Sequence, residues 1–217
     1  GSEMCIRDRM TRMQDEVITG IANLIESRDG STGLHVKNTQ NYVQILTKAL
    51  REKGMYPDIL DHNYELNTVK ASVLHDIGKI KTPDAILLKP GRLTDEEFEV
   101  MKQHTVAGCE IIDRIIGNVE HEEYVDIARK IARYHHERWD GTGYPDGLSG
   151  EEIPLCARIM ALADVFDALY QDRCYKKAIR PASKVFEIIK ENSGSQFDPN
   201  LTEIFLELQR EITDISE

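Results

Sequence analysis

The chain has 217 residues and carries 27 lysine and arginine residues against 38 aspartate and glutamate residues, a formal charge of -11. Apolar residues make up 41% and charged residues 30%, a globular balance that excludes a disordered or fibrous protein. The acidic surplus argues against binding of long DNA or RNA, because neutralising phosphates needs a basic face. No apolar run approaches the roughly 20 residues that cross a bilayer, so we expect no membrane association and a cytoplasmic location.

Apolar residues recur at helical spacing along most of the chain, and alternation typical of strands is absent, so we predict an all-α architecture. Residues 1–12 have no apolar period and are interpreted as a cloning scar or a disordered tail. Residues 13–30 are expected to form a connector helix, and residues 31–217 the main domain. The helices predicted within that domain cover residues 31–54, 64–78, 94–116, 122–137, 155–170, 182–191 and 200–212.

Two segments of the main domain are predicted to interrupt the helices. Residues 81–93 contain two prolines and a glycine, which favour a turn. Thr94 and Glu97 have the spacing of a capping box, which indicates that the next helix begins there. Residues 139–150 are so rich in glycine that we expect a shaped loop without regular structure.

The His75-Asp76 pair is the first candidate for chemistry. Asp76 falls on the apolar stripe of the predicted helix 64–78, together with Val69 and Val73. An ionised carboxylate buried there without a cation would be very costly. A helix N-cap or a buried salt bridge would also supply a partner, but the negative end of a helix dipole disfavours an anion at this position. The pattern therefore favours metal ligation by Asp76.

Further histidines fall on or beside apolar helix faces. His35 and His104, taken singly, would more often be hydrogen-bonded core residues. The adjacent pair His135 and His136 differs, because neighbouring helical residues diverge by about 100° and could bind two separate metals. Asp164 lies on a helix face of mostly small residues, which allows other helices to approach closely.

Together these positions supply five imidazoles and two carboxylates from five predicted helices. One metal cannot use them all, whereas two metals bridged by a carboxylate could, with positions left for water and substrate. A mixed nitrogen and oxygen set favours iron, manganese or zinc over magnesium or calcium. The candidate ligands are His35, His75, Asp76, His104, His135, His136 and Asp164.

Five short sequence motifs follow one another along the main domain. They are HDIGK at 75–79, KPGRL at 89–93, HHERWDGTGYP at 135–145, ADVFDAL at 163–169 and DRCYKK at 172–177. Their order resembles that of the HD-GYP family, a branch of the HD-domain phosphohydrolases, and the resemblance extends from about residue 20 to the C-terminus. It implies an HD-domain helical bundle with additional C-terminal helices and a Gly-rich GYP loop.

Members of this family are metal-dependent phosphodiesterases, and the resemblance implies hydrolysis of cyclic di-GMP to linear pGpG, with slower conversion to GMP. It implies that all seven candidates bind two divalent transition-metal ions, iron or manganese, with zinc as an alternative. Asp76 would bridge the metals and, with Lys79, be catalytic. Lys79 would also contact the scissile phosphate, Arg173 and Lys176 the phosphates from the far side, and Tyr144 a guanine.

One departure from the family and two alternative functions bear on this interpretation. Ser31 stands where relatives with three metals have glutamate, which favours a two-metal site. The chain could instead be a signalling module that binds cyclic di-GMP or a partner protein without turnover, or an HD hydrolase of another cyclic dinucleotide. The helix at 13–30 could serve homodimerisation or couple to an upstream receiver or sensor domain.

Overall fold

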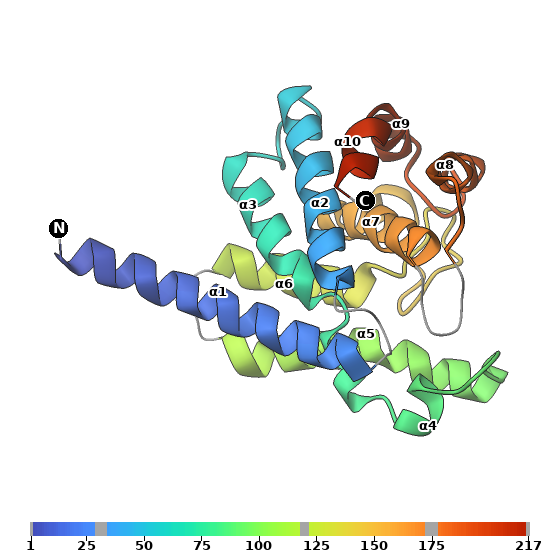
Figure 1. Ribbon diagram of the computed structural model, residues 1–217, viewed down its shortest axis with the longest axis horizontal. Coiled ribbons are helices and arrows are strands. Elements are labelled where there is room, and N and C mark those ends of the chain that lie inside the picture. Colours follow the sequence, from blue (N-terminus) through green and yellow to red (C-terminus); the bar gives the residue numbers. More distant parts are fainter. Residues whose placement is uncertain (1, 29–33, 118–121, 172–177, 216–217) are drawn as a thin grey trace.

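The computed structural model describes residues 2–28, 34–117, 122–171 and 178–215. Within these ranges every regular element is a helix, and extended pairing is limited to an isolated bridge between Ser193 and Phe197. This confirms the all-α prediction (Figure 1). None of the described helices combines the length and the apolar character needed to cross a bilayer.

Five helices form the body of the bundle, and α1 (Ser2–Arg28) lies across it with its N-terminal end projecting outward (Figure 1). In the body α2 packs on α3 and α7, and α6 packs on α3, α5 and α7. These helices are α2 (His35–Glu52), α3 (His62–Ala71), α5 (Asp95–Ile116), α6 (Glu122–Tyr134) and α7 (Leu155–Tyr170). The remaining elements are η1 (Ser72–Leu74), η2 (Ile77–Lys81), α4 (Asp84–Leu87), η3 (Gly150–Glu152), α8 (Ala182–Glu191), α9 (Pro199–Glu207) and α10 (Gln209–Asp214).

Helix α7 lies at the centre of the core, because most of its side chains are buried and none is exposed. Its Phe166 ring lies 5.1 Å from the ring of Tyr42 on α2. The same ring lies 4.9 Å from Phe186 on α8 and 5.6 Å from Phe205 on α9. The C-terminal helices therefore share one core with the body of the bundle.

The N-terminal helix is longer than predicted. Helix α1 begins at Ser2, so residues 2–12 are helical and do not form a disordered tail. Ala22 and Ile25 fix the end of α1 on the core, with 3% and 4% of their surfaces exposed. A helix held in this way extends at little cost through residues of good helix propensity, such as the methionines and arginines of this segment.

The predicted helix 64–78 is wrong at its C-terminal end. Helix α3 ends at Ala71, and the chain continues through η1 and η2, with Asp76 at the junction between them. The segment after α3 approaches α5 closely at Gly78, where an added Cβ atom would lie 1.8 Å from the carbonyl oxygen of His104. This approach places Asp76 beside α5, which a continuous helix need not do.

Two other helix ends also differ from the predictions. Helix α6 ends at Tyr134, so His135 and His136 lie in the turn that follows and not on the helix. The predicted helix 200–212 is divided into α9 and α10 at Leu208, whose backbone leaves the helical region. The capping box is confirmed, because the Thr94 hydroxyl accepts from the Glu97 N–H and the Glu97 carboxylate accepts from the Thr94 N–H.

Candidate metal centre

All seven predicted ligands lie together at the place where five segments of the chain meet. They fall into two groups whose ligand atoms lie within 4.8 Å of one another inside each group. His35 begins α2, His75 and Asp76 join η1 to η2, His104 lies on α5, His135 and His136 follow α6, and Asp164 lies on α7.

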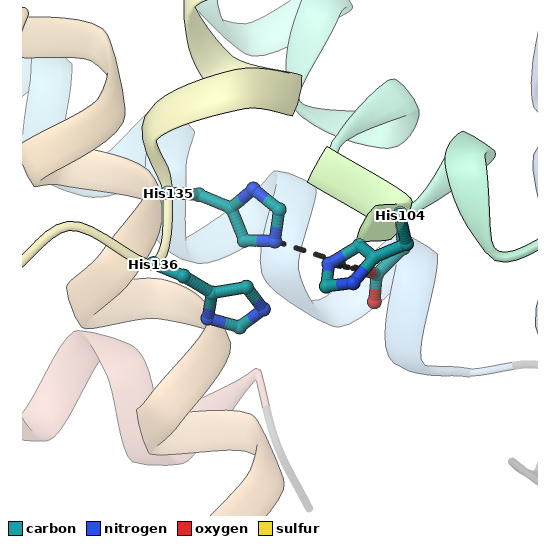
Figure 2. Close-up of side chains that lie close together, drawn as sticks. His104, His135 and His136 are labelled. Atoms are coloured by element: carbon teal, nitrogen blue, oxygen red, sulfur yellow. Dashed lines mark ion pairs between the residues drawn. The ribbon is translucent and has the colours of Figure 1, made fainter. Parts of the chain in front are cut away.

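The first group consists of Asp76, His104, His135 and His136. Asp76 Oδ1 lies 3.3 Å from His104 Nε2 and 3.7 Å from His135 Nε2. Figure 2 shows the rings of His104, His135 and His136 turned toward a common space. The second group consists of His35, His75 and Asp164. His35 Nε2 lies 3.3 Å from His75 Nε2 and 3.5 Å from Asp164 Oδ1.

Asp76 lies between the two groups. Its Oδ1 atom faces His104 and His135 of the first group, whereas its Oδ2 atom lies 3.3 Å from His75 Nε2 of the second. The two oxygens of a single carboxylate thus face different sets of imidazoles. A carboxylate whose oxygens are divided in this way can bridge two cations.

Hydrogen bonds at the opposite ring nitrogen orient the histidines. The acceptors are one carboxylate and three backbone carbonyls, so we infer that Nδ1 carries the proton and Nε2 presents its lone pair to the centre. The bonds join His35 Nδ1 to Asp167 Oδ2 (2.7 Å), His75 to the Ser72 carbonyl (2.9 Å), His104 to that of Met101 (2.7 Å) and His135 to that of Ile131 (3.0 Å).

Asp167 is a residue of the site that sequence reasoning placed on the same helix face as Asp164 but to which it gave no role. It is fully buried, and its second oxygen accepts hydrogen bonds from Asn38 Nδ2 at 3.1 Å and from the Tyr42 hydroxyl at 3.4 Å. The signal available in the sequence was its position one turn after Asp164 on an otherwise apolar helix. Such a carboxylate can orient a ligand instead of binding metal itself.

The electrostatics of the site favour a neutral imidazole at His104 and His136 and an ionised carboxylate at Asp76. Burial lowers the pKa of His104 to about 4 and that of His136 well below its usual value. Burial alone would raise the pKa of Asp76, but Lys79 and His75 outweigh it and hold the carboxyl ionised. Burial would lower the pKa of His75, and the adjacent Asp76 carboxylate outweighs this and raises it to about 9.

Several buried atoms in the centre are left without a hydrogen-bond partner within the described part of the chain. These atoms are Asp76 Oδ1, His104 Nε2 and His135 Nε2. Buried polar atoms are normally paired, and their unsatisfied state is expensive. Since all three point into one group of nitrogen and oxygen donors, the residues fit a divalent transition-metal ion.

Lys79 and Glu26 complete the charged interior of the site. Lys79 Nζ lies 2.7 Å from Asp76 Oδ2 and 3.5 Å from Glu26 Oε1. Glu26, on α1, has 2% of its surface exposed, and its carboxylate lies within 4.8 Å of ligand atoms of His35 and Asp76. Sequence reasoning gave Glu26 no role, although its spacing from the apolar residues Ala22 and Ile25 already placed it on the inner face of α1.

The GYP loop borders the first group. The Tyr144 ring lies 4.8 Å from the His136 ring, and Phe98 of α5 meets Tyr144 edge to face at 5.9 Å. The buried Glu137 carboxylate accepts from the N–H groups of Asp146 and Gly147, which holds the loop on the turn after α6. Tyr144 is thus placed at the edge of the centre, where it was expected.

Three residues that the sequence analysis singled out have no described position relative to this centre. Arg173 and Lys176, expected to hold phosphates, lie outside the described residues, and so does Ser31.

The protein is an all-α helical bundle with two buried groups of imidazoles and carboxylates, and Asp76 lies between them. This set of nitrogen and oxygen donors fits divalent metal ions. The chain belongs to the HD domain family, whose model matches residues 21–201. The HDIGK and GYP segments assign it to the HD-GYP branch.

Relatives of known name and a solved structure support this assignment. The chain is 45% identical over 206 residues to a cyclic di-GMP phosphodiesterase of Vibrio cholerae, covering 94% of this chain and 41% of that protein. A cyclic di-GMP phosphodiesterase of Thermotoga maritima is 42% identical over 200 residues, covering 92% and 50%. The chain therefore spans half or less of the length of these relatives. An HD-GYP-like protein of Bdellovibrio bacteriovorus shares the fold, with a TM-score of 0.58 at 17% identity and coverage of 90% and 62%.

Proposed function

We propose that this chain is a metal-dependent phosphodiesterase that hydrolyses cyclic di-GMP to linear pGpG, with slower conversion to GMP. The observation that carries the proposal is the position of Asp76, whose two oxygens face different groups of histidines. The names of the relatives from Vibrio cholerae and Thermotoga maritima support the choice of substrate.

The cofactor is proposed to be two divalent ions, iron or manganese, with zinc as the alternative. His104, His135 and His136 would hold one ion, His35, His75 and Asp164 the other, and Asp76 would bridge them. Bound in this way, divalent ions lower the pKa of water and polarise phosphoryl oxygens. The mixed donor set of five imidazoles and two carboxylates favours iron, manganese or zinc over magnesium or calcium, and the family resemblance places iron and manganese before zinc.

The side chains of this protein would bind and orient the substrate. The Lys79 ammonium would offset charge that develops on the phosphoryl oxygens of the scissile diester. Tyr144 would pack against a guanine at the edge of the centre, since aromatic rings stack well on bases. Arg173 and Lys176 are proposed, from the sequence alone, to hold the phosphates from the far side.

The N-terminal helix is proposed to connect this domain to a second copy or to an upstream receiver or sensor domain. In support, α1 exposes apolar side chains, with exposed fractions of 59% for Met13, 56% for Val17 and 69% for Leu24. Light scattering tests the dimer by comparing the mass in solution of the chain with and without residues 1–30.

The function is tested by anaerobic purification, elemental analysis and chromatography of the reaction with cyclic di-GMP. We expect metal-loaded protein to release pGpG as the main product. Bound cyclic di-GMP without turnover by the metal-loaded protein would favour the binding module. Faster turnover of a mixed cyclic dinucleotide supplied in parallel would favour the alternative of an HD hydrolase that acts on another cyclic dinucleotide.

A further inference from the structure

We propose that Glu26 is a positioning residue that holds the Lys79 ammonium in place for the phosphodiesterase reaction. The inference rests on the proposed function, because it concerns the same reaction at the same site. It assigns a role to the end of α1, which neither the motifs nor the predicted ligand set includes.

The contact between the two side chains lies in the interior of the protein. The Glu26 and Lys79 side chains are 3% and 11% exposed, and Lys79 Nζ lies 3.5 Å from Glu26 Oε1. Charges are weakly screened at such depth, so a carboxylate at this distance strongly stabilises an ammonium group. Loss of one partner would leave a buried charge with less compensation.

Helix α1 is also fastened to the segment that carries Lys79. The Arg28 guanidinium, two residues after Glu26, pairs with Asp84 Oδ1 at 2.6 Å. It also donates to backbone carbonyl oxygens of η2 and of the residue after it, namely those of Lys79 (3.4 Å), Ile80 (3.3 Å) and Thr82 (3.4 Å). The backbones that carry Glu26 and Lys79 are thus held together independently of the ion pair.

Asp76 alone is a poor anchor for Lys79. Its Oδ2 atom contacts the Lys79 ammonium at 2.7 Å but also lies 3.3 Å from His75 Nε2. A cation held by His75 and Asp76 would use this oxygen and repel the ammonium. Glu26 approaches Lys79 from α1, so its carboxylate can hold the ammonium in position while Asp76 serves as a ligand.

Glu26 could alternatively bind a third cation, because its carboxylate lies within 4.8 Å of ligand atoms of His35 and Asp76. The Lys79 ammonium argues against this, since it lies close to both Glu26 and Asp76 and would repel a metal ion between them. The two roles predict different metal contents and different behaviour when Lys79 is replaced.

The test is a double-mutant cycle on the metal-loaded chain with Glu26→Gln, Lys79→Met and the double variant. Glu16→Gln is the matched control, because Glu16 is an exposed glutamate on the same helix. We expect Glu26→Gln to lower kcat/KM by about 10- to 100-fold, the effect of one charge-assisted interaction, at unchanged metal content. The double variant should be no slower than Lys79→Met alone, since Glu26 acts through Lys79.

Three results would overturn the proposal. Loss of metal in Glu26→Gln would make Glu26 a ligand. If the losses of kcat/KM in the two single variants multiplied in the double variant, Glu26 would act independently of Lys79. Full activity of Glu26→Gln would show that Glu26 has no role in the reaction. If Glu26→Gln folds poorly, Glu26→Asp serves in its place, with an intermediate loss expected. The cycle is run on both bis(p-nitrophenyl) phosphate and cyclic di-GMP, so that a wrong substrate assignment is distinguished from a wrong role for Glu26.

Discussion

Asp167 accepts a hydrogen bond of 2.7 Å from His35 Nδ1, and both residues are buried. The bond turns His35 Nε2 toward His75 and Asp164, at 3.3 Å and 3.5 Å. Asp167 is itself held by Asn38 and Tyr42 of α2, the helix that His35 begins. His35 of the second group is therefore oriented by a layer of residues that does not face the centre.

Replacing Asp167 with Asn should weaken metal binding without unfolding the chain. The amide removes the charge that favours a proton on His35 Nδ1, and loss of such an orienting partner typically costs about 10- to 100-fold in metal affinity. Elemental analysis after dialysis against graded chelator measures the effect. Asp126→Asn, at an exposed position of α6, is the control, and equal metal retention in both variants would contradict the orienting role.

With the two-metal site proposed above, Asp76→Ala should remove both metals together with hydrolysis, because the two Asp76 oxygens face both groups of ligands. Asp164→Ala, which changes the second group alone, should leave more of the metal in place. Metal content per chain distinguishes these outcomes. Retention of two metals by Asp76→Ala would refute the bridging role.

The meeting of the seven candidate ligands could be predicted from the sequence because it depends on residue type and order. Helices α7 and α8 were predicted with the bounds found, since strong apolar patterns and clear flanking turns define them. The roles of Glu26 and Asp167 could not be predicted in this way. A carboxylate on a helix is usually solvated, and only the packing of α1 on η2 and of α7 on α2 shows that these two are buried.

The interruption after Ala71 was missed for a related reason. The apolar residues of 64–78 keep helical spacing to the end of that range, which predicts a continuous helix. The tight approach of Gly78 to His104, however, is a contact between segments that lie far apart in the sequence. Local propensity carries no information about such a contact. The chain therefore reaches the predicted meeting of Asp76 and His104 by a different local structure.

Metal binding should release a proton near neutral pH. In the chain without metal, His75 has a pKa raised to about 9, so at pH 7 its imidazole holds a proton that a cation must displace. Apparent affinity should therefore rise with pH and level off above about pH 9. Calorimetry in buffers of different ionisation enthalpy counts the protons released, and a count of zero at pH 7 would contradict this.

Arg173 and Lys176 are predicted to hold phosphates without touching metal. Replacing either with Ala should weaken substrate binding by about 1.5 to 3 kcal/mol, the range for a charge-assisted hydrogen bond, at unchanged metal content. The comparison needs KM and elemental analysis on the same preparations. Loss of metal along with activity would make these residues structural and the assignment wrong.

Gly78→Ala should pull the first group of ligands apart. An added Cβ would lie 1.8 Å from the His104 carbonyl oxygen and 2.5 Å from the Gly108 nitrogen, both backbone atoms that cannot rotate away. Helix α5 must then shift from η2, which moves His104 away from Asp76. We expect a loss of about 1 to 3 kcal/mol in the free energy of unfolding, as for overpacked cores, and weaker metal binding in the first group.

Gly20→Ala is the matched control for this substitution. Gly20 lies on α1 with no atom within 4 Å of an added Cβ. Alanine there should stabilise the helix by about 0.5 to 1 kcal/mol, because it lowers the entropy lost on folding. Chemical denaturation and elemental analysis of both variants make the comparison. Wild-type metal content and stability in Gly78→Ala would show that α5 can move without disturbing the centre, contrary to the close packing that positions His104.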